Sequence, residues 1–133
     1  MRHVSKQAHL LLLEDDNFDV IVLQRSMATA KIKFEVHLAT DGEEALEKLG
    51  LLGEQSFDIH PEIVVLDINV PRISGLEVCR KIRQTPKYKN LHVVFFSGSR
   101  SEQDKAQAFI AGANAYFDKN EGPRALMQHI QQL

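Results

Sequence analysis

Acidic side chains follow two apolar runs in this sequence. Glu14, Asp15 and Asp16 come directly after four leucines, and Asp67 comes directly after the run IVVL. If both runs are strands of one parallel sheet, their carboxyl ends meet at one edge, where clustered carboxylates repel one another unless a cation lies between them. A few hard oxygen ligands favour Mg²⁺, which keeps several of its waters. We therefore predict a Mg²⁺ site at this edge.

A hydroxyl and an ammonium follow two later apolar runs. Ser97 ends the run HVVFFS, and Lys119 follows AYFD. Around a Mg²⁺–carboxylate centre these groups suit a phosphoryl group, because cations offset the charge on its oxygens and the hydroxyl donates to one of them. A carboxylate can itself be the nucleophile. Asp67 is the best candidate, since it stands alone between Leu66 and Ile68.

The segments that would position these groups alternate between apolar runs and helical patterns. The patterns predict strands at 9–15, 34–40, 62–68, 92–98 and 114–119, and helices at 17–30, 41–53, 75–85, 101–113 and 122–133. This alternation predicts parallel βαβ units in a three-layer, doubly wound α/β domain. Several of the apolar runs do not alternate with polar residues, which indicates strands covered by helices on both faces. In the simplest topology the first and third strands are neighbours.

The composition narrows the class of protein. The 133 residues fit one domain, with 44% hydrophobic and 26% charged residues and a formal net charge of -2, so we expect a globular protein without nucleic-acid or membrane contacts. A single cysteine excludes a disulfide within the chain. The N-terminal stretch MRHVSKQAH lacks the apolar segment of a signal peptide, so a cytoplasmic location is the expectation. The six histidines are scattered, and no Cys/His spacing resembles a zinc site.

Four segments together resemble the receiver domain of two-component response regulators. They are LLLEDDNFD, VVLDINVPRISGLE, FFSGS and AYFDK, and the intervals from Asp67 to Ser97 and from Ser97 to Lys119 also fit that family. The resemblance covers nearly the whole chain. It implies a flavodoxin-like (βα)5 fold with a five-stranded parallel sheet in the order 2-1-3-4-5. It also implies one receiver domain over 1–133, with no output domain.

The resemblance assigns a role to the acids around the predicted metal site. Asp67 would be the phospho-acceptor, receiving a phosphoryl group from the phosphohistidine of a histidine kinase. Mg²⁺ would be held by Glu14, Asp15, Asp67 and the backbone carbonyl of Asn69. Such a protein signals through its phosphorylated state and is not an enzyme.

The resemblance also implies a switch. Ser97 would be the switch hydroxyl, Lys119 the phosphate-binding lysine and Tyr116 the switch aromatic. Phosphorylation would then alter the surface formed by the fourth helix, the fifth strand and the fifth helix. That surface carries the apolar segment AFIAGANAYF, so we expect a homodimer and a protein–protein output there.

Two features depart from the usual receiver pattern. Asn120 stands where the family usually has proline, so we expect a trans peptide bond after Lys119. The connection at 52–61 is longer than in the shortest receivers. Both features are similar to single-domain regulators that partner bacterial phytochrome histidine kinases.

Several polar residues have simpler interpretations. Asp16 suits a helix N-cap, and with Asp19 it resembles a weak capping box. Cys79 is predicted to be an inert core thiol. The five basic residues between 80 and 89 predict a solvated face.

Three other classes of protein remain to be weighed. A pseudo-receiver would keep the fold and bind partners without phosphate; Asn120 is its only support. A phosphohydrolase with an aspartate nucleophile usually needs a second carboxylate two residues later, where this chain has Asn69. A flavodoxin-like cofactor binder needs a phosphate-binding loop after the first strand, where three acids would repel phosphate.

Overall fold

The computed structural model describes residues 7–53 and 58–133. The start of the N-terminal stretch, and residues 54–57 of the predicted long connection, lie outside the described residues. Within the described part of the chain, no helix has the length and apolar character needed to cross a membrane.

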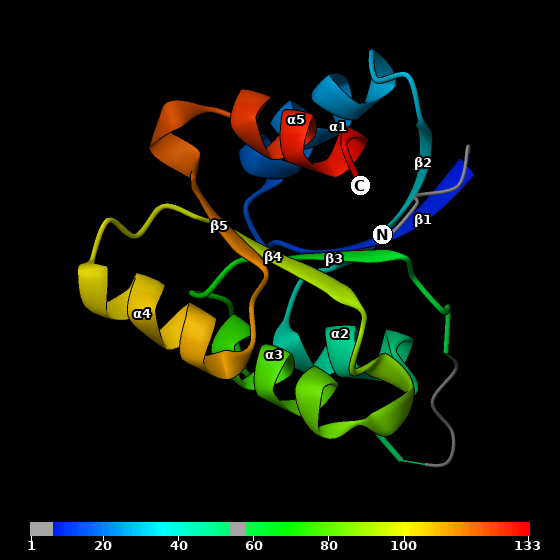
Figure 1. The fold of residues 1–133 in the computed structure, drawn as a ribbon, viewed down its shortest axis with the longest axis vertical. Helices are drawn as coiled ribbons and strands as arrows, with labels where there is room; N and C mark the ends of the chain where they lie inside the picture. Colours follow the sequence, from blue (N-terminus) through cyan, green and yellow to red (C-terminus); the bar gives the residue numbers. More distant parts are fainter. Residues whose placement is uncertain (1–6, 54–57) are drawn as a thin grey trace.

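Five parallel strands form one sheet between two layers of helices (Figure 1). The strands are β1 (Gln7–Leu13), β2 (Lys33–Ala39), β3 (Ile63–Leu66), β4 (His92–Ser97) and β5 (Ala115–Asp118), in the order β2-β1-β3-β4-β5. The helices are α1 (Asn17–Ala28), α2 (Gly42–Lys48), α3 (Gly75–Gln84), α4 (Glu102–Ala111) and α5 (Arg124–Gln131). Helices α1 and α5 cover one face, and α2, α3 and α4 cover the other (Figure 1). The predicted fold class and strand order are confirmed.

The central strands are apolar on both sides because each side packs against a helical layer. Leu11 and Leu13 point to the cluster under α2, α3 and α4, whereas Leu10 and Leu12 point to the cluster under α1 and α5. All four residues of β3 are buried. The acids that follow β1 and β3 are therefore carried on strands fixed from both faces.

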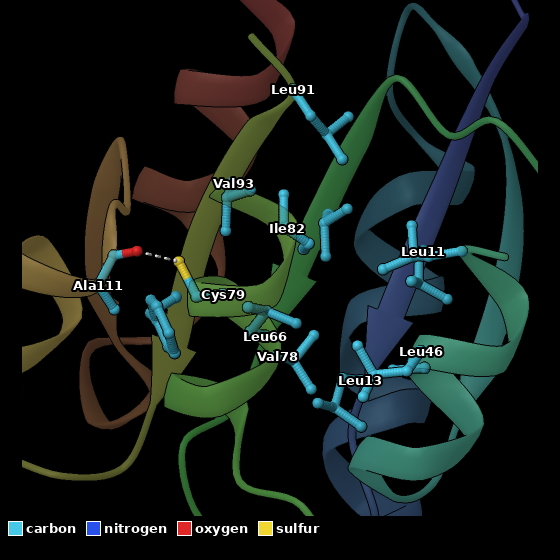
Figure 2. Packing of buried hydrophobic residues seen from close by; sticks show 14 of the residues in the cluster. Leu11, Leu13, Leu46, Leu66, Val78, Cys79, Ile82, Leu91, Val93 and Ala111 are labelled. Atoms are coloured by element: carbon cyan, nitrogen blue, oxygen red, sulfur yellow. Dashed lines mark hydrogen bonds between the residues drawn. The ribbon is translucent and has the colours of Figure 1, made fainter. Parts of the chain in front are cut away.

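Cys79 belongs to the larger of these clusters (Figure 2). Its side chain is fully buried, and its thiol donates to the carbonyl oxygen of Ala111 at 3.4 Å. Burial raises the pKa of the thiol to about 11, which keeps it protonated and unreactive at neutral pH. The prediction of an inert core thiol agrees with this environment.

Arg83 is not part of a solvated basic face, so that prediction is wrong for this residue. Its Nε donates to the carbonyl of Gly112 (2.8 Å), and its Nη1 donates to the carbonyl of Leu91 (2.7 Å). Its Nη2 donates to the side-chain oxygen of Asn114 at 2.8 Å. Gly112 ends α4 with a φ of 112°, and a Cβ there would lie 2.4 Å from the Arg83 side chain. One guanidinium thus joins α3 to the end of α4 and the start of β4.

Replacing Arg83 should therefore destabilise the fold. We expect Arg83→Met to lower the free energy of unfolding by about 2–3 kcal/mol, because several carbonyl groups lose a charged donor. Urea denaturation followed by circular dichroism measures this. The matched control is Lys89→Met, an exposed basic residue nearby, for which we expect a change within about 0.5 kcal/mol. Equal effects of the two substitutions would contradict the structural role of Arg83.

Candidate functional site

Three carboxylates meet where β1 and β3 end. These strands pair in register up to Leu13 and Leu66, so the residues that follow are neighbours. One carboxylate oxygen from each of Glu14, Asp15 and Asp67 lies within 4.8 Å of the others. Glu14 and Asp67 are buried, whereas Asp15 is exposed. The predicted convergence of these acids is present in the structure.

The ammonium of Lys119 lies among these acids. Lys119 follows directly after β5, and its Nζ lies 2.5 Å from Glu14 Oε2 and 2.7 Å from Asp67 Oδ2. A third acid, Asp19 of α1, holds the same nitrogen at 2.9 Å. Lys119 thus supplies positive charge to the buried acids, which would otherwise repel one another.

The pKa values of this group follow from burial and pairing. Burial raises the pKa of the Glu14 carboxyl, against the opposing effect of its hydrogen bond from Lys119; the nearby charge of Asp67 raises it further. Burial alone would lower the pKa of Lys119, but hydrogen bonds to Asp67, Glu14 and Asp19 more than offset this and raise it. The lysine is therefore a fixed cation at physiological pH.

Asp16 and Asp19 have different roles. Asp16 caps α1 as predicted, since its Oδ1 accepts from the amides of Phe18 (2.8 Å) and Asp19 (3.2 Å). The predicted capping box is wrong, because Asp19 bonds to Lys119 and the amide of Asp16 donates to Glu14 Oε1 at 3.1 Å. Sequence reasoning missed Asp19 as a site residue. The available signal was an acid in the first turn of a helix that starts at the acidic edge of the sheet.

Asp67 and Lys119 line an open cleft. Its lining residues come from the loops at the carboxyl edge of the sheet: Asp19, Asp67, Asn69, Gly98, Ser99, Lys119 and Asn120. Asn69 is exposed at this edge. Ser97 is fully buried and is not among the lining residues; its hydroxyl accepts from the amide of Ser99 at 3.2 Å.

Tyr116 lies outside the cleft. Its ring packs against Phe95 with centroids 6.2 Å apart, and its hydroxyl donates to the carbonyl of Ser99 at 2.9 Å. Ser99 also donates its own hydroxyl to Asp104 of α4 at 2.6 Å. The two predicted switch residues, Ser97 and Tyr116, are therefore connected through Ser99.

Asn120 joins the loops that follow β4 and β5. Its side-chain amide donates to the carbonyl of Gly98 (3.2 Å) and to Asp118 Oδ1 (2.8 Å). The peptide bond before it is trans, as expected, since no cis bond occurs in residues 7–53 or 58–133. An amide side chain here supplies a loop contact that proline cannot make.

The donor set of the cluster fits a hard divalent cation. Its ligand atoms are carboxylate oxygens of Glu14, Asp15 and Asp67, which suit Mg²⁺ better than softer metals. Two of the three acids are already paired with Lys119, so a cation would share its ligands with the ammonium. The carbonyl of Asn69 as a further ligand stays a prediction.

The fold and the site together define a class of protein: a doubly wound α/β domain that carries an acid cluster and a lysine at the carboxyl edge of its sheet. Residues 10–131 match the model of the response regulator receiver domain. The chain belongs to this family, as its motifs predicted.

Known relatives include regulators from cyanobacteria and Bacillus. Response regulator Rcp1 of Synechocystis sp. is 30% identical over 122 residues, which cover 92% of this chain and 83% of Rcp1. The transcriptional regulatory protein YrkP of Bacillus subtilis is 36% identical over 110 residues. That match covers 83% of this chain, which spans only 42% of the length of YrkP.

Solved structures similar to this chain are also response regulators. The Mn²⁺-bound form of Rcp1 superposes with a TM-score of 0.80 at 30% identity, covering 94% of this chain and 90% of that one. The phosphorylated cyanobacterial phytochrome response regulator RcpA gives a TM-score of 0.81 at 29% identity, covering 95% and 90%. The predicted similarity to phytochrome response regulators is confirmed.

Removing the ammonium of Lys119 should strengthen cation binding. We expect Lys119→Gln to raise the affinity for Mg²⁺ about tenfold, because an internal cation no longer competes for Glu14 and Asp67. Isothermal titration calorimetry measures the affinity. Lys105→Gln, on the exposed side of α4, makes the same change in net charge and should leave it unaltered. An unchanged or weaker affinity in Lys119→Gln would show that the ammonium does not compete.

Proposed function

We propose that this chain is a phospho-accepting response regulator in which Asp67 receives a phosphoryl group from the phosphohistidine of a histidine kinase. The observation that carries the proposal is the contact of Asp67 Oδ2 with Lys119 Nζ, 2.7 Å apart, beside the acid cluster and open to the cleft. The solved phosphorylated form of RcpA supports it. The acceptor is thus a buried carboxylate with an adjacent cation and solvent access.

The residues at the site have separate tasks. The carboxylate of Asp67 attacks phosphorus in line as the P–N bond to the kinase histidine breaks and its imidazole leaves. The fixed position of Asp67 at the end of β3 reduces the entropy lost on reaching that geometry. Glu14, Asp15, Asp67 and the carbonyl of Asn69 would hold Mg²⁺, and the existence of a Mn²⁺-bound form of the similar protein Rcp1 supports binding of a divalent metal. When bound, the metal supplies positive charge that offsets the charge of the phosphoryl oxygens.

Lys119 binds the product. Its ammonium already contacts the acceptor carboxylate, so it needs only a small movement to pair with a phosphoryl oxygen on Asp67. Asp19 and Glu14 hold the same nitrogen within the site before transfer. Lys119 is thereby kept in position for the charge that transfer creates.

Ser97 begins the response to phosphorylation. Its buried hydroxyl accepts from the amide of Ser99 in this structure. Turning that hydroxyl toward a phosphoryl oxygen removes the acceptor of the Ser99 amide, and the carbonyl of Ser99 holds Tyr116. Movement of this loop therefore alters Tyr116 and the surface of α4, β5 and α5, a population shift in which the covalent phosphate is the ligand.

A phytochrome histidine kinase is the proposed phosphodonor. The support is the similarity over almost the whole chain to RcpA, described as a phytochrome response regulator.

Phosphorylation is tested by intact mass after incubation with a small phosphodonor and Mg²⁺. We expect the native chain to gain about 80 Da, the mass of one phosphoryl group, and Asp67→Asn to gain nothing, because the acceptor oxygen is lost. The matched control is Asp16→Asn, which keeps a good N-cap residue and should label normally. Labelling of Asp67→Asn would place the acceptor elsewhere. A folded native chain without label would favour a pseudo-receiver that binds partners without phosphate.

We further propose that the output surface forms a homodimer. Phe109 and Ile110 of α4 are 44% and 74% exposed, and they belong to the same surface as Tyr116 of β5. Large apolar side chains exposed together favour a protein contact. A second copy of this chain is the proposed partner.

Charge at Ile110 should disrupt this dimer. We expect Ile110→Glu to be monomeric after phosphorylation, because burial of an unpaired carboxylate in an apolar contact is costly. Size-exclusion chromatography with light scattering measures the mass in solution. Ile21→Glu is the control, since Ile21 is 48% exposed on α1, on the other helical layer. A phosphorylated dimer that persists in Ile110→Glu would contradict the proposed surface.

A further inference from the structure

Two histidines far apart in the sequence meet on the edge of the sheet. In the parallel pairing of β1 with β2, His9 lies opposite Glu35 and Leu11 lies opposite His37. Glu35 and His37 are two residues apart on one strand, so their side chains share a face with His9. The sequence suggested no zinc-type spacing because these ligands come together only through strand pairing.

The three side chains bring one ligand atom each into a small volume. His9 Nδ1 lies 3.1 Å from His37 Nε2 and 3.5 Å from Glu35 Oε2, and all three ligand atoms lie within 4.8 Å of one another. A tetrahedral metal with bonds of about 2.0–2.2 Å separates its ligand atoms by roughly 3.3–3.6 Å. Two of the three separations are therefore within a few tenths of an ångström of coordination geometry.

We propose that His9, Glu35 and His37 form a second metal site, for a divalent transition-metal cation of the Zn²⁺ type. Two imidazoles and one carboxylate are a common ligand set for Zn²⁺, and a fourth position stays open to water. The side chains of His9 and Glu35 are 44% and 51% exposed, so a cation reaches the site from solvent. The exposed Glu35 carboxylate can turn toward His37, which would bring the third pair of ligand atoms to coordination distance.

This site is separate from the acid cluster in place and in chemistry. His9 is five residues before Glu14 on the extended strand β1, a distance of about 17 Å. Imidazole nitrogens favour Zn²⁺ over Mg²⁺, whereas the cluster at Glu14 offers only carboxylate oxygens. Excess Mg²⁺ can therefore fill one site and leave the other free.

The alternative is a pair of imidazoles that share one hydrogen bond. The ring centroids are 5.4 Å apart and the rings are inclined by 23°, which suits a hydrogen bond between the facing nitrogens. This alternative and the metal site differ in the role of Glu35. The carboxylate is a ligand in the metal site, whereas the hydrogen bond between the rings does not need it.

The test is titration of the full chain with Zn²⁺ in excess Mg²⁺, followed by calorimetry. We expect one Zn²⁺ per chain, and a loss of affinity of at least about tenfold in both His37→Gln and Glu35→Gln. Zn²⁺ should also raise the melting temperature of the native chain more than that of either variant. The melting temperatures without metal show whether each variant is folded.

Matched controls distinguish Zn²⁺ binding at this site from Zn²⁺ binding by histidines and acids elsewhere in the chain. His60→Asn and Glu47→Gln change exposed residues outside the group, and both should bind Zn²⁺ like the native chain. His129→Gln disrupts the other imidazole pair, in which His92 Nε2 and His129 Nε2 are 2.8 Å apart. Loss of binding in His129→Gln but not in His37→Gln would overturn the proposal. So would absence of Zn²⁺ binding to the native chain, or unchanged affinity in Glu35→Gln.

Discussion

The contact between Lys119 and three acids is the interaction on which the site depends. Two carboxylates, Glu14 and Asp67, are buried at the ends of neighbouring strands, where a charged group without a nearby cation is costly. Lys119 provides that cation from the far side of the sheet, across β4. A site organised in this way pairs its buried acids with a cation that the chain itself supplies.

The rest of the fold serves to place these few groups. From Leu10 to Leu13 of β1 and throughout β3 all the side chains are apolar and buried, so these segments are held by both helical layers. Arg83 fixes α3 against the end of α4, which limits how far α4 can move as a unit. The loops at the carboxyl edge carry the polar contacts that link Asp67 to Lys119 and Ser97 to Tyr116.

Much of the fold and the site could be predicted from the sequence, for identifiable reasons. Apolar runs predicted the strands. Because parallel strands end at one edge of the sheet, the acids after two of these runs predicted the convergence of Glu14, Asp15 and Asp67. Side-chain contacts between residues that no motif links could not be predicted. Asp19 and Arg83 look like ordinary surface residues until their partners are known, and His9 and His37 are separated by 28 positions.

Ser99 has a consequence for the way this protein could respond. Its amide, carbonyl and hydroxyl are all engaged, with Ser97, Tyr116 and Asp104 respectively. A residue held by three hydrogen bonds cannot move gradually, because a displacement large enough to break one hydrogen bond distorts the other two. The loop is therefore expected to have two well-defined conformations without populated intermediates. Each molecule would then be in one conformation or the other, and a graded response would reflect the fraction of molecules in each.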